Sequence, residues 1–125
     1  MNIPGGLKYT KEHEWIKVEG NVGTIGITDF AQGELGDVVF VDIDPNLDSI
    51  TANESFGTIE AVKTVSELFA PSTGKILEIN SKLENEPQLL NSDPYGEGWL
   101  IKFEIADLCT LDDLLDAEAY SSLLT

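Results

Sequence analysis

Two strand-like runs flank a single lysine in residues 56–71, which read Phe56-Gly57-Thr58-Ile59-Glu60-Ala61-Val62-Lys63-Thr64-Val65-Ser66-Glu67-Leu68-Phe69-Ala70-Pro71. In the first run Phe56, Thr58 and Glu60 alternate with Gly57 and Ile59. The second run ends at Pro71. Such runs, separated by a few residues, predict a β-hairpin over about residues 56–70. Lys63 is then at or near its tip, and it is the only basic residue between Lys17 and Lys75.

Lys63 has two interpretations. An exposed turn lysine usually serves only to keep a chain soluble, but such a lysine usually has charged neighbours, and those of Lys63 are Val62 and Thr64. A tip lysine with small or β-branched neighbours is accessible to a modifying enzyme. Acylation would convert its ammonium into a neutral amide and attach a cofactor to its flexible stem. The position alone does not identify that cofactor.

Composition limits the classes of partner. A length of 125 residues predicts one domain over residues 1–125, and an apolar content of 42% predicts a globular core. The 23 acidic residues against seven lysines give a net charge of −16. This charge excludes nucleic acid and anionic membranes as partners, because both require cations on the protein. It favours basic protein surfaces as partners, and like-charge repulsion favours a monomer.

The sequence also predicts where the protein is found. No apolar run is long enough for a transmembrane helix. Residues 1–6 lack the basic start and apolar stretch of a signal peptide, and the chain has no arginine, in which transit peptides are rich. The single Cys109 excludes an internal disulfide and suits a reducing compartment. We expect a cytoplasmic protein, or a mitochondrial-matrix protein if a presequence has been removed.

Short strands are predicted along most of the chain, over residues 13–18, 22–27, 37–43, 75–80 and 99–105, with a short extended segment at 49–51. Thr28 or Asp29 can cap a short helix that ends at Gly33 or Gly36. Another helical turn is predicted within residues 82–90. Apolar residues at helical spacing predict an amphipathic C-terminal helix over about residues 110–124, capped by Thr110.

A faint internal repeat relates two halves of the chain. Residues 36–42 resemble residues 74–80, and a polar connection, a glycine and an apolar strand follow each of them. Two similar halves of short strands predict a quasi-symmetric β-sandwich or flattened barrel that closes its own edges. The predicted fold is mainly β, with the Lys63 hairpin joining the halves at one end.

The motifs in this order and spacing resemble those of the H-protein family of the glycine cleavage system, whose members are lipoyl carriers. The resemblance runs from about Leu7 to beyond Trp99. It rests on His13-Glu14-Trp15, on Gly26-Ile27-Thr28-Asp29 with Ala31-Gln32, on Leu35-Gly36-Asp37-Val38-Val39, on Ile59-Glu60-Ala61-Val62-Lys63 with Ser66, Ala70-Pro71 and Gly74, and on Pro94-Tyr95-Gly96 with Gly98-Trp99-Leu100.

The resemblance implies a barrel-sandwich hybrid fold and lipoic acid in amide linkage on Lys63. It implies a carrier without catalytic residues or a metal site, because the cofactor supplies the chemistry. It implies three partner enzymes. Pyridoxal-phosphate-dependent glycine decarboxylase loads an aminomethyl group, aminomethyltransferase passes the one-carbon unit to tetrahydrofolate, and dihydrolipoyl dehydrogenase reoxidises the dithiol. A lipoylating ligase or transferase is the fourth partner.

Glu14 and Glu67 are the further site residues that the resemblance implies. Acidic and polar groups near these positions line a cleft that can hold the aminomethyl arm, where an ammonium would gain charge-assisted hydrogen bonds. This sequence departs from the family at two places. The family more often has aspartate at the position of Glu67 and a smaller residue at that of Glu12. The alternative is that both carboxylates are simply solvated. His13, the only histidine, is interpreted as structural.

Other functions remain as alternatives. A lipoyl relay, which donates lipoate to other complexes, has the same sequence requirements as a carrier for glycine cleavage. A biotin carrier shares the architecture, but its lysine usually lies between two methionines, and here Val62 and Thr64 flank Lys63. An acidic β-rich binding module would carry no modification at all.

Overall fold

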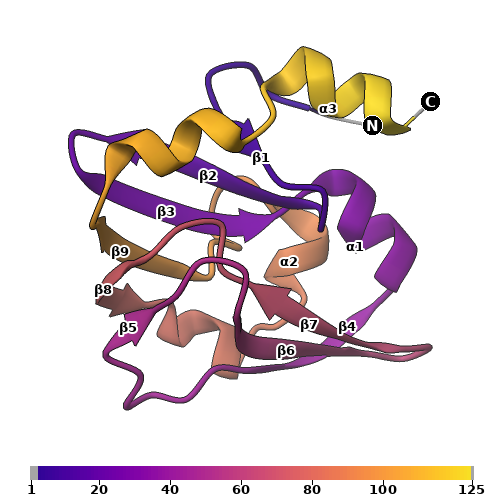
Figure 1. Ribbon diagram of the computed structural model, residues 1–125. Helices are drawn as coiled ribbons and strands as arrows, with labels where there is room; N and C mark the ends of the chain where they lie inside the picture. The colour runs from indigo at the N-terminus through magenta and orange to yellow at the C-terminus, as the bar shows by residue number, and fades with distance from the viewer. Residues whose placement is uncertain (1–2, 125) are drawn as a thin grey trace.

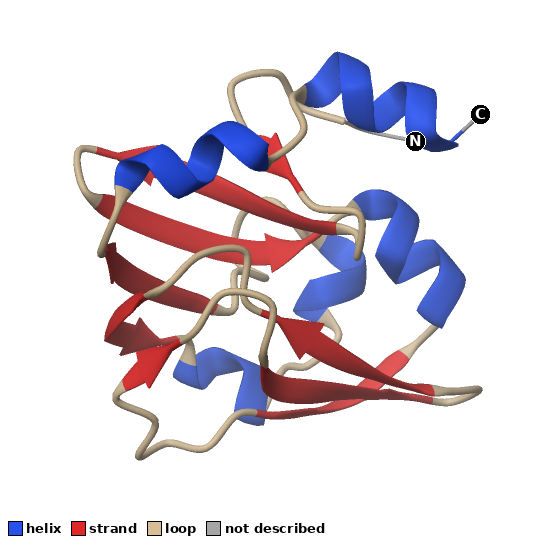
Figure 2. Ribbon diagram, in the orientation of Figure 1, coloured by secondary structure: helices blue, strands red, loops and turns tan. Residues whose placement is uncertain are grey.

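The computed structural model describes residues 3–124, apart from the side chains of residues 108–110. Two antiparallel sheets form most of the molecule, and short helices surround them (Figures 1 and 2). The six-stranded sheet has the order β1-β2-β3-β9-β8-β5, and the three-stranded sheet has the order β4-β6-β7. The predicted mainly β architecture with short helices is therefore confirmed, but the predicted closure of the edges is wrong, because both sheets are open.

The larger sheet is built from β1 (Lys8–Tyr9), β2 (Glu14–Glu19), β3 (Val22–Ile27), β5 (Ser49–Ile50), β8 (Gly74–Ile79) and β9 (Ile101–Ile105). The smaller sheet is built from β4 (Val38–Asp42), β6 (Ser55–Ala61) and β7 (Val65–Phe69). The α-helices are α1 (Asp29–Leu35), α2 (Leu89–Ser92) and α3 (Ala117–Leu124), and 3-10 segments cover Ser81–Glu84 and Leu108–Asp113. No described helix is long and apolar enough to cross a membrane.

The main core lies between the two sheets. It combines Ile16, Ile25 and Phe103 of the larger sheet with Ile59 and Leu68 of the smaller one, all buried. Burial of such side chains is the dominant favourable contribution to folding. In β6, Phe56, Ile59 and Ala61 are buried whereas Glu60 is exposed, so the smaller sheet has one face against the core and one face toward solvent.

The repeat in the sequence corresponds to a repeated pairing. In the first half β4 pairs with β6 in antiparallel fashion, and in the second half β8 pairs with β9 in the same way. The two pairs lie in different sheets, on opposite sides of the core. The hairpin of β6 and β7 extends from the smaller sheet and ends in a tip that projects from the molecule (Figure 1).

Helix α1 ends where the sequence offers a glycine. Thr28 caps its first turn by accepting a hydrogen bond from the amide of Ala31. Gly36 follows the last turn with φ of +76°, a backbone conformation that glycine adopts without the steric cost of a side chain. Gly33, the other predicted end point, lies inside the helix.

The C-terminal segment differs from the predicted helix over residues 110–124. Residues 108–113 form a 3-10 segment, and α3 begins only at Ala117. Between them, Leu115 pairs with Tyr9 through two backbone hydrogen bonds, which a continuous helix would not permit. Asp116 caps α3 by accepting from the amide of Ala119. The side chains of Thr110, the predicted cap, and of Cys109 lie outside the described part of the structure.

Candidate functional site

Lys63 lies in the turn between β6 and β7, at the tip of the hairpin, and is exposed. The turn is closed by a hydrogen bond of 2.8 Å from the amide of Ala61 to the carbonyl of Thr64. The amide of Val62 donates to the carbonyl of Asp37 at 3.0 Å, which ties the tip to the start of β4. In residues 3–124 the ion pairs are Lys17–Glu19 and Lys82–Glu97, so no carboxylate among them holds the Lys63 ammonium.

The stem of Lys63 runs beside the C-terminal end of α1. A Cβ atom placed on Gly36 would lie 3.2 Å from Cε of Lys63, so only a residue without a side chain leaves the stem its full space. Asn91 of α2 holds the segment between α1 and β4 through its side chain. Its side-chain amide donates to the carbonyl of Gly36 at 2.8 Å, and its Oδ1 accepts from the amide of Val38 at 2.9 Å. The base of the Lys63 turn is therefore held by the end of α1, the start of β4 and Asn91 of α2.

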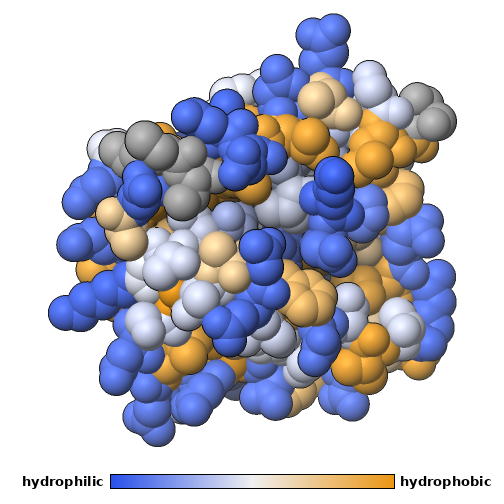
Figure 3. All heavy atoms as spheres, viewed as in Figure 1, coloured by the Kyte–Doolittle hydropathy of each residue, from blue (hydrophilic) through white to orange (hydrophobic). Residues whose placement is uncertain are grey.

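Apolar side chains surround the tip although it faces solvent. Val62 is 74% exposed and Val65 is 61% exposed, and Val39 and Phe40 of β4 are also exposed. The register between β4 and β6 shifts between Val38 and Phe40, and such a bulge turns successive side chains to unusual faces. Hydrophilic residues dominate much of the face that Figure 3 shows. The area around Lys63 is thus more apolar than the net charge of the chain suggests.

A small cavity of about 110 Å³ lies between α1, β7 and the turn that precedes β2. Four carboxylate residues line it: Glu12, Glu14, Glu34 and Glu67. Its other walls are apolar and include Ile27, Ala31, Leu35, Ile59 and Leu68. The structure thus brings Glu14 and Glu67, far apart in sequence, to the same cavity. A second cavity of about 470 Å³, lined in part by Phe69, Ala70 and Pro71, shares Glu12 and Glu14 as walls but is farther from the hairpin tip.

Glu14 is buried, with 1% of its surface exposed, so the alternative of a solvated carboxylate is wrong for this residue. Its Oε2 accepts a hydrogen bond of 2.7 Å from the amide of Phe69. Its Oε1 has a longer contact of 3.4 Å with the hydroxyl of Thr10. Burial raises the pKa of Glu14 from 4.5 to about 8, because the charged form loses its hydration, while the Phe69 amide partly opposes this shift.

Glu67 differs from Glu14 in its surroundings. It is exposed on β7 and stands at the rim of the cavity, opposite Thr58 in the β6 register. Glu60, the residue next to the Lys63 turn, is exposed and does not line the cavity. The two predicted carboxylates therefore have unequal positions, one buried and one at the entrance.

Several residues of the site have no signal in the sequence. Glu34 reaches the cavity only because α1 packs beside β7, and the backbone amide of Phe69 becomes a donor only because β7 is an edge strand. Asn91 resembles any other turn residue until the fold places it under Gly36. The positive φ of His13, +67°, is likewise invisible in a sequence without glycine at that position.

Known proteins resemble this chain over nearly its whole length. The family model described as "Glycine cleavage H-protein" matches residues 7–125. The glycine cleavage system H protein of Bacteroides thetaiotaomicron is 59% identical over 124 residues, which cover 99% of this chain and 98% of that protein. The protein of the same name from Symbiobacterium thermophilum is 56% identical over 121 residues, or 97% and 94% of the two chains.

The fold has a counterpart among solved structures. The crystal structure of a glycine cleavage system H protein from Mycobacterium marinum superimposes with a TM-score of 0.88 at 38% identity, and the match covers 98% of each chain. Sequence and fold therefore agree over nearly the whole chain. The chain belongs to the glycine cleavage H-protein family.

Proposed function

We propose that this chain is the lipoyl carrier of a glycine cleavage system and that Lys63 carries the lipoyl group as an amide. The observation behind this proposal is the exposed lysine at a projecting hairpin tip in a chain of this family. The flanking residues Val62 and Thr64 favour lipoate over biotin, because biotin carriers usually have methionines at these positions.

The surroundings of Lys63 fit such a group. Its Nζ is accessible for acylation, in which the amine and the carboxyl of lipoate form an amide and the ammonium charge is lost. A neutral, largely apolar arm then matches the exposed Val62 and Val65 better than it matches the acidic remainder of the surface. When bound, the lipoyl group supplies a dithiolane that opens to two thiols in a two-electron exchange.

The partners follow from this role. Glycine decarboxylase, aminomethyltransferase and dihydrolipoyl dehydrogenase would each receive the arm in turn, and a lipoylating ligase or transferase would attach it. The chain contributes position and shelter and no catalytic group. The net charge of −16 favours basic surfaces on these enzymes and a monomeric carrier. The bacterial relatives favour the cytoplasm as its location.

The cavity beside the hairpin supplies the shelter in this proposal. The Lys63 stem passes Gly36, and the next residues of α1, Leu35 and Glu34, line the cavity. Glu67 is four residues from Lys63, which corresponds to roughly 13 Å along an extended strand. Glu67 at the rim and Glu14 inside the cavity would then be the residues that meet the ammonium of a loaded arm folded back along β7.

Glu14 is suited to receive an ammonium. An opposite charge nearby favours the ionised form of a carboxyl, so the cation would offset the burial that now favours the protonated form, and a proton would leave to water. The resulting charge-assisted hydrogen bond would be shielded from competing water. The carboxylates thereby retain a loaded, cationic arm, whereas an unloaded, neutral arm gains nothing from them.

Substitution of Lys63 tests the attachment site. Lys63→Arg keeps the positive charge but cannot be acylated to a lipoamide, and Lys75→Arg is the matched control on an exposed strand position. In a system reconstituted with the partner enzymes, we expect Lys63→Arg to abolish glycine-dependent exchange of bicarbonate while circular dichroism stays unchanged. Lys75→Arg should retain full exchange. Full exchange by Lys63→Arg would refute the proposal.

A further inference from the structure

The turn that carries Glu12 and Glu14 has an unusual backbone. His13, between them, adopts φ of +67°, which is uncommon for a residue other than glycine and is held in place only by surrounding contacts. The hydroxyl of Thr10 accepts hydrogen bonds from the amides of Glu12 and Glu14, at 3.2 and 3.1 Å. These local bonds shape the turn, and the carbonyl of His13 also accepts a hydrogen bond of 3.1 Å from the amide of Thr28.

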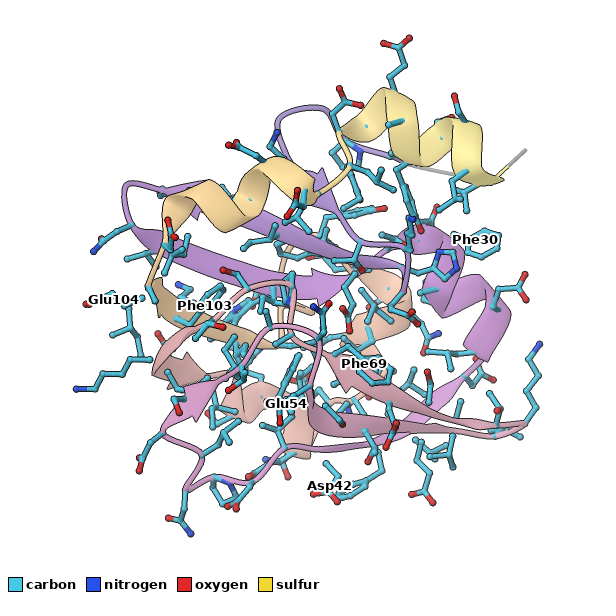
Figure 4. The ribbon with its side chains drawn as sticks, in the orientation of Figure 1. Phe30, Asp42, Glu54, Phe69, Phe103 and Glu104 are labelled. Atoms are coloured by element: carbon cyan, nitrogen blue, oxygen red, sulfur yellow. The ribbon has the colours of Figure 1, made fainter. Side chains whose placement is uncertain are left out.

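The side chain of His13 adds a further connection between the turn and the rest of the molecule. Its ring packs against Phe30 of α1, with ring centres 4.6 Å apart, and Phe30 lies on α1 below α3 (Figure 4). Its Nδ1 is 2.8 Å from the hydroxyl of Tyr120, which comes from the C-terminal helix α3. One ring thus links the turn to two helices.

The hydroxyl of Tyr120 also reaches the other wall of the cavity. It lies 2.7 Å from Oγ1 of Thr28, the residue that caps α1. Helix α1 supplies Ala31, Glu34 and Leu35 to the cavity, and the turn supplies Glu12 and Glu14. The Tyr120 hydroxyl therefore links the two cavity walls through side chains, beside the backbone hydrogen bond of 3.1 Å from the amide of Thr28 to the carbonyl of His13.

Tyr120 is itself fixed in place. It has no exposed surface, and its ring stacks on that of Tyr9 with a centroid distance of 4.8 Å and an interplanar angle of 6°. The backbone pairing of Tyr9 with Leu115 anchors the segment just before α3. Because the ring is held by stacking and burial, the hydroxyl can act as a rigid reference point for both walls.

We propose that Tyr120 is a positioning residue for the arm cavity: its hydroxyl holds the His13 turn and α1 at the separation that a loaded arm requires. This inference rests on the proposed carrier function. Loss of the hydroxyl leaves the partly buried Nδ1 of His13 and the buried Oγ1 of Thr28 without that partner, and an unmade hydrogen bond at a buried group is costly. The backbone bond from Thr28 to His13 remains, but the side-chain link between the turn and the helix is lost, so the turn becomes looser and admits water to the arm.

Tyr120→Phe and Tyr9→Phe form a matched pair for the test. Both keep the aromatic stack and remove one phenol oxygen. The Tyr9 hydroxyl donates to the carbonyl of Pro4, and within residues 3–124 it makes no hydrogen bond to the turn or to α1. The carriers are lipoylated, loaded by glycine decarboxylase and separated from the enzyme. Water then hydrolyses the aminomethyl group from the lipoyl sulfur, which gives ammonia, formaldehyde and the free thiol. The release of ammonia and formaldehyde measures the rate of this loss.

We expect Tyr120→Phe to shorten the lifetime of the loaded arm by roughly fivefold or more, and Tyr9→Phe to leave it unchanged. The rate of lipoylation at Lys63 should be the same in both variants, because the hairpin tip does not depend on the hydroxyl. In the unlipoylated chain, the NMR signals of the imidazole ring of His13, the only histidine, should shift in Tyr120→Phe and not in Tyr9→Phe. Equal lifetimes in the two variants, or losses that merely follow their melting temperatures, would overturn the proposal.

Two further variants complete the design. If Tyr120→Phe does not fold, His13→Asn replaces it, because asparagine tolerates the left-handed backbone but is too short to reach Tyr120; it should shorten the lifetime in the same way. Glu14→Gln distinguishes the positioning role of Tyr120 from the sheltering of the arm by the cavity, on which that role rests. A short lifetime in Glu14→Gln with a normal one in Tyr120→Phe rejects only the role of Tyr120. A normal lifetime in Glu14→Gln rejects the cavity as a shelter, and the inference with it.

Discussion

The carboxylate of Glu14 accepts a 2.7 Å hydrogen bond from the amide of Phe69, and this bond joins β2 to the strand that follows the Lys63 turn. Phe69 lies at the end of β7, near the centre of the molecule in Figure 4. The same carboxylate lines the cavity beside the hairpin. One buried acid therefore serves both the attachment of the hairpin and the surface that would meet a loaded arm.

Glu14→Gln should change how stability depends on pH. The folded-state pKa of Glu14 is raised from 4.5 to about 8, so the folded chain binds the extra proton more tightly than the unfolded chain does. Its contribution is therefore fully present below pH 4.5 and is lost as the pH rises toward 8. Glutamine has the shape of the protonated acid and does not titrate. Relative to Glu14→Gln, the wild type should lose roughly 3–5 kcal/mol across this window.

Urea unfolding at pH 5 and at pH 8.5 measures this difference, with Glu67→Gln as the control because Glu67 is exposed. The free energy of unfolding of Glu67→Gln should follow the wild type at both values. A constant difference between wild type and Glu14→Gln would mean that Glu14 is ionised in the folded protein throughout the range.

The lifetime of a loaded arm should depend on the carboxylates that line the cavity and not on others nearby. Glu14→Gln should shorten it most, because it removes the buried partner of the ammonium, and Glu67→Gln should shorten it less, because water screens an exposed pair. Glu60→Gln is the matched control on the same hairpin, exposed and outside the cavity. Release of ammonia from the isolated carrier gives the three rates. Identical rates for Glu14→Gln and Glu60→Gln would rule out the cavity.

Two glycines should respond to alanine in opposite directions. A Cβ on Gly74 would lie 2.0 Å from the backbone oxygen of Glu104, so Gly74→Ala forces β8 away from β9 and should cost more than about 2 kcal/mol. Gly33 lies inside α1 with no atom within 4 Å of such a Cβ, so Gly33→Ala should stabilise by up to about 1 kcal/mol. Thermal unfolding measures both. A stable Gly74→Ala variant would contradict the β8–β9 register.

Sodium chloride should raise the melting temperature. The chain carries a net charge of −16, and the ion pairs Lys17–Glu19 and Lys82–Glu97 of residues 3–124 are solvent-exposed, so repulsion among carboxylates outweighs attraction. Screening weakens that repulsion in the folded state. A melting temperature that falls with added sodium chloride would show that specific ion pairs matter more than net charge.

The hairpin and the family motifs were predictable because they depend on local sequence. Alternation around Ile59 and the turn at Lys63 set β6 and β7 without reference to distant residues. The C-terminal helix was predicted too long, because its apolar spacing is helical whereas Leu115 is drawn into a backbone pair with Tyr9, more than a hundred positions away. No local pattern signals such a contact.

The burial of Glu14 has a similar explanation. Its neighbours Glu12 and His13 suggest a polar, solvated turn, and only the packing of β7 and the left-handed backbone at His13 direct the carboxyl inward. The role of Tyr120 is equally non-local, since it depends on α3 folding back onto the first turn of α1. The exposed lysine at the hairpin tip could thus be predicted from local sequence, whereas the cleft with Glu14 and Glu67 was implied only by the family resemblance.

The attachment of lipoate to Lys63 is tested most directly by the intact mass of the protein made in a host supplied with lipoate, followed by peptide mapping. We predict a lipoyl-sized increment confined to the peptide that contains Lys63, and no increment in Lys63→Arg. A biotin-sized increment would contradict the cofactor, and an increment on another lysine would contradict the site. No increment at all, with a competent lipoylating enzyme present, would contradict the carrier function itself.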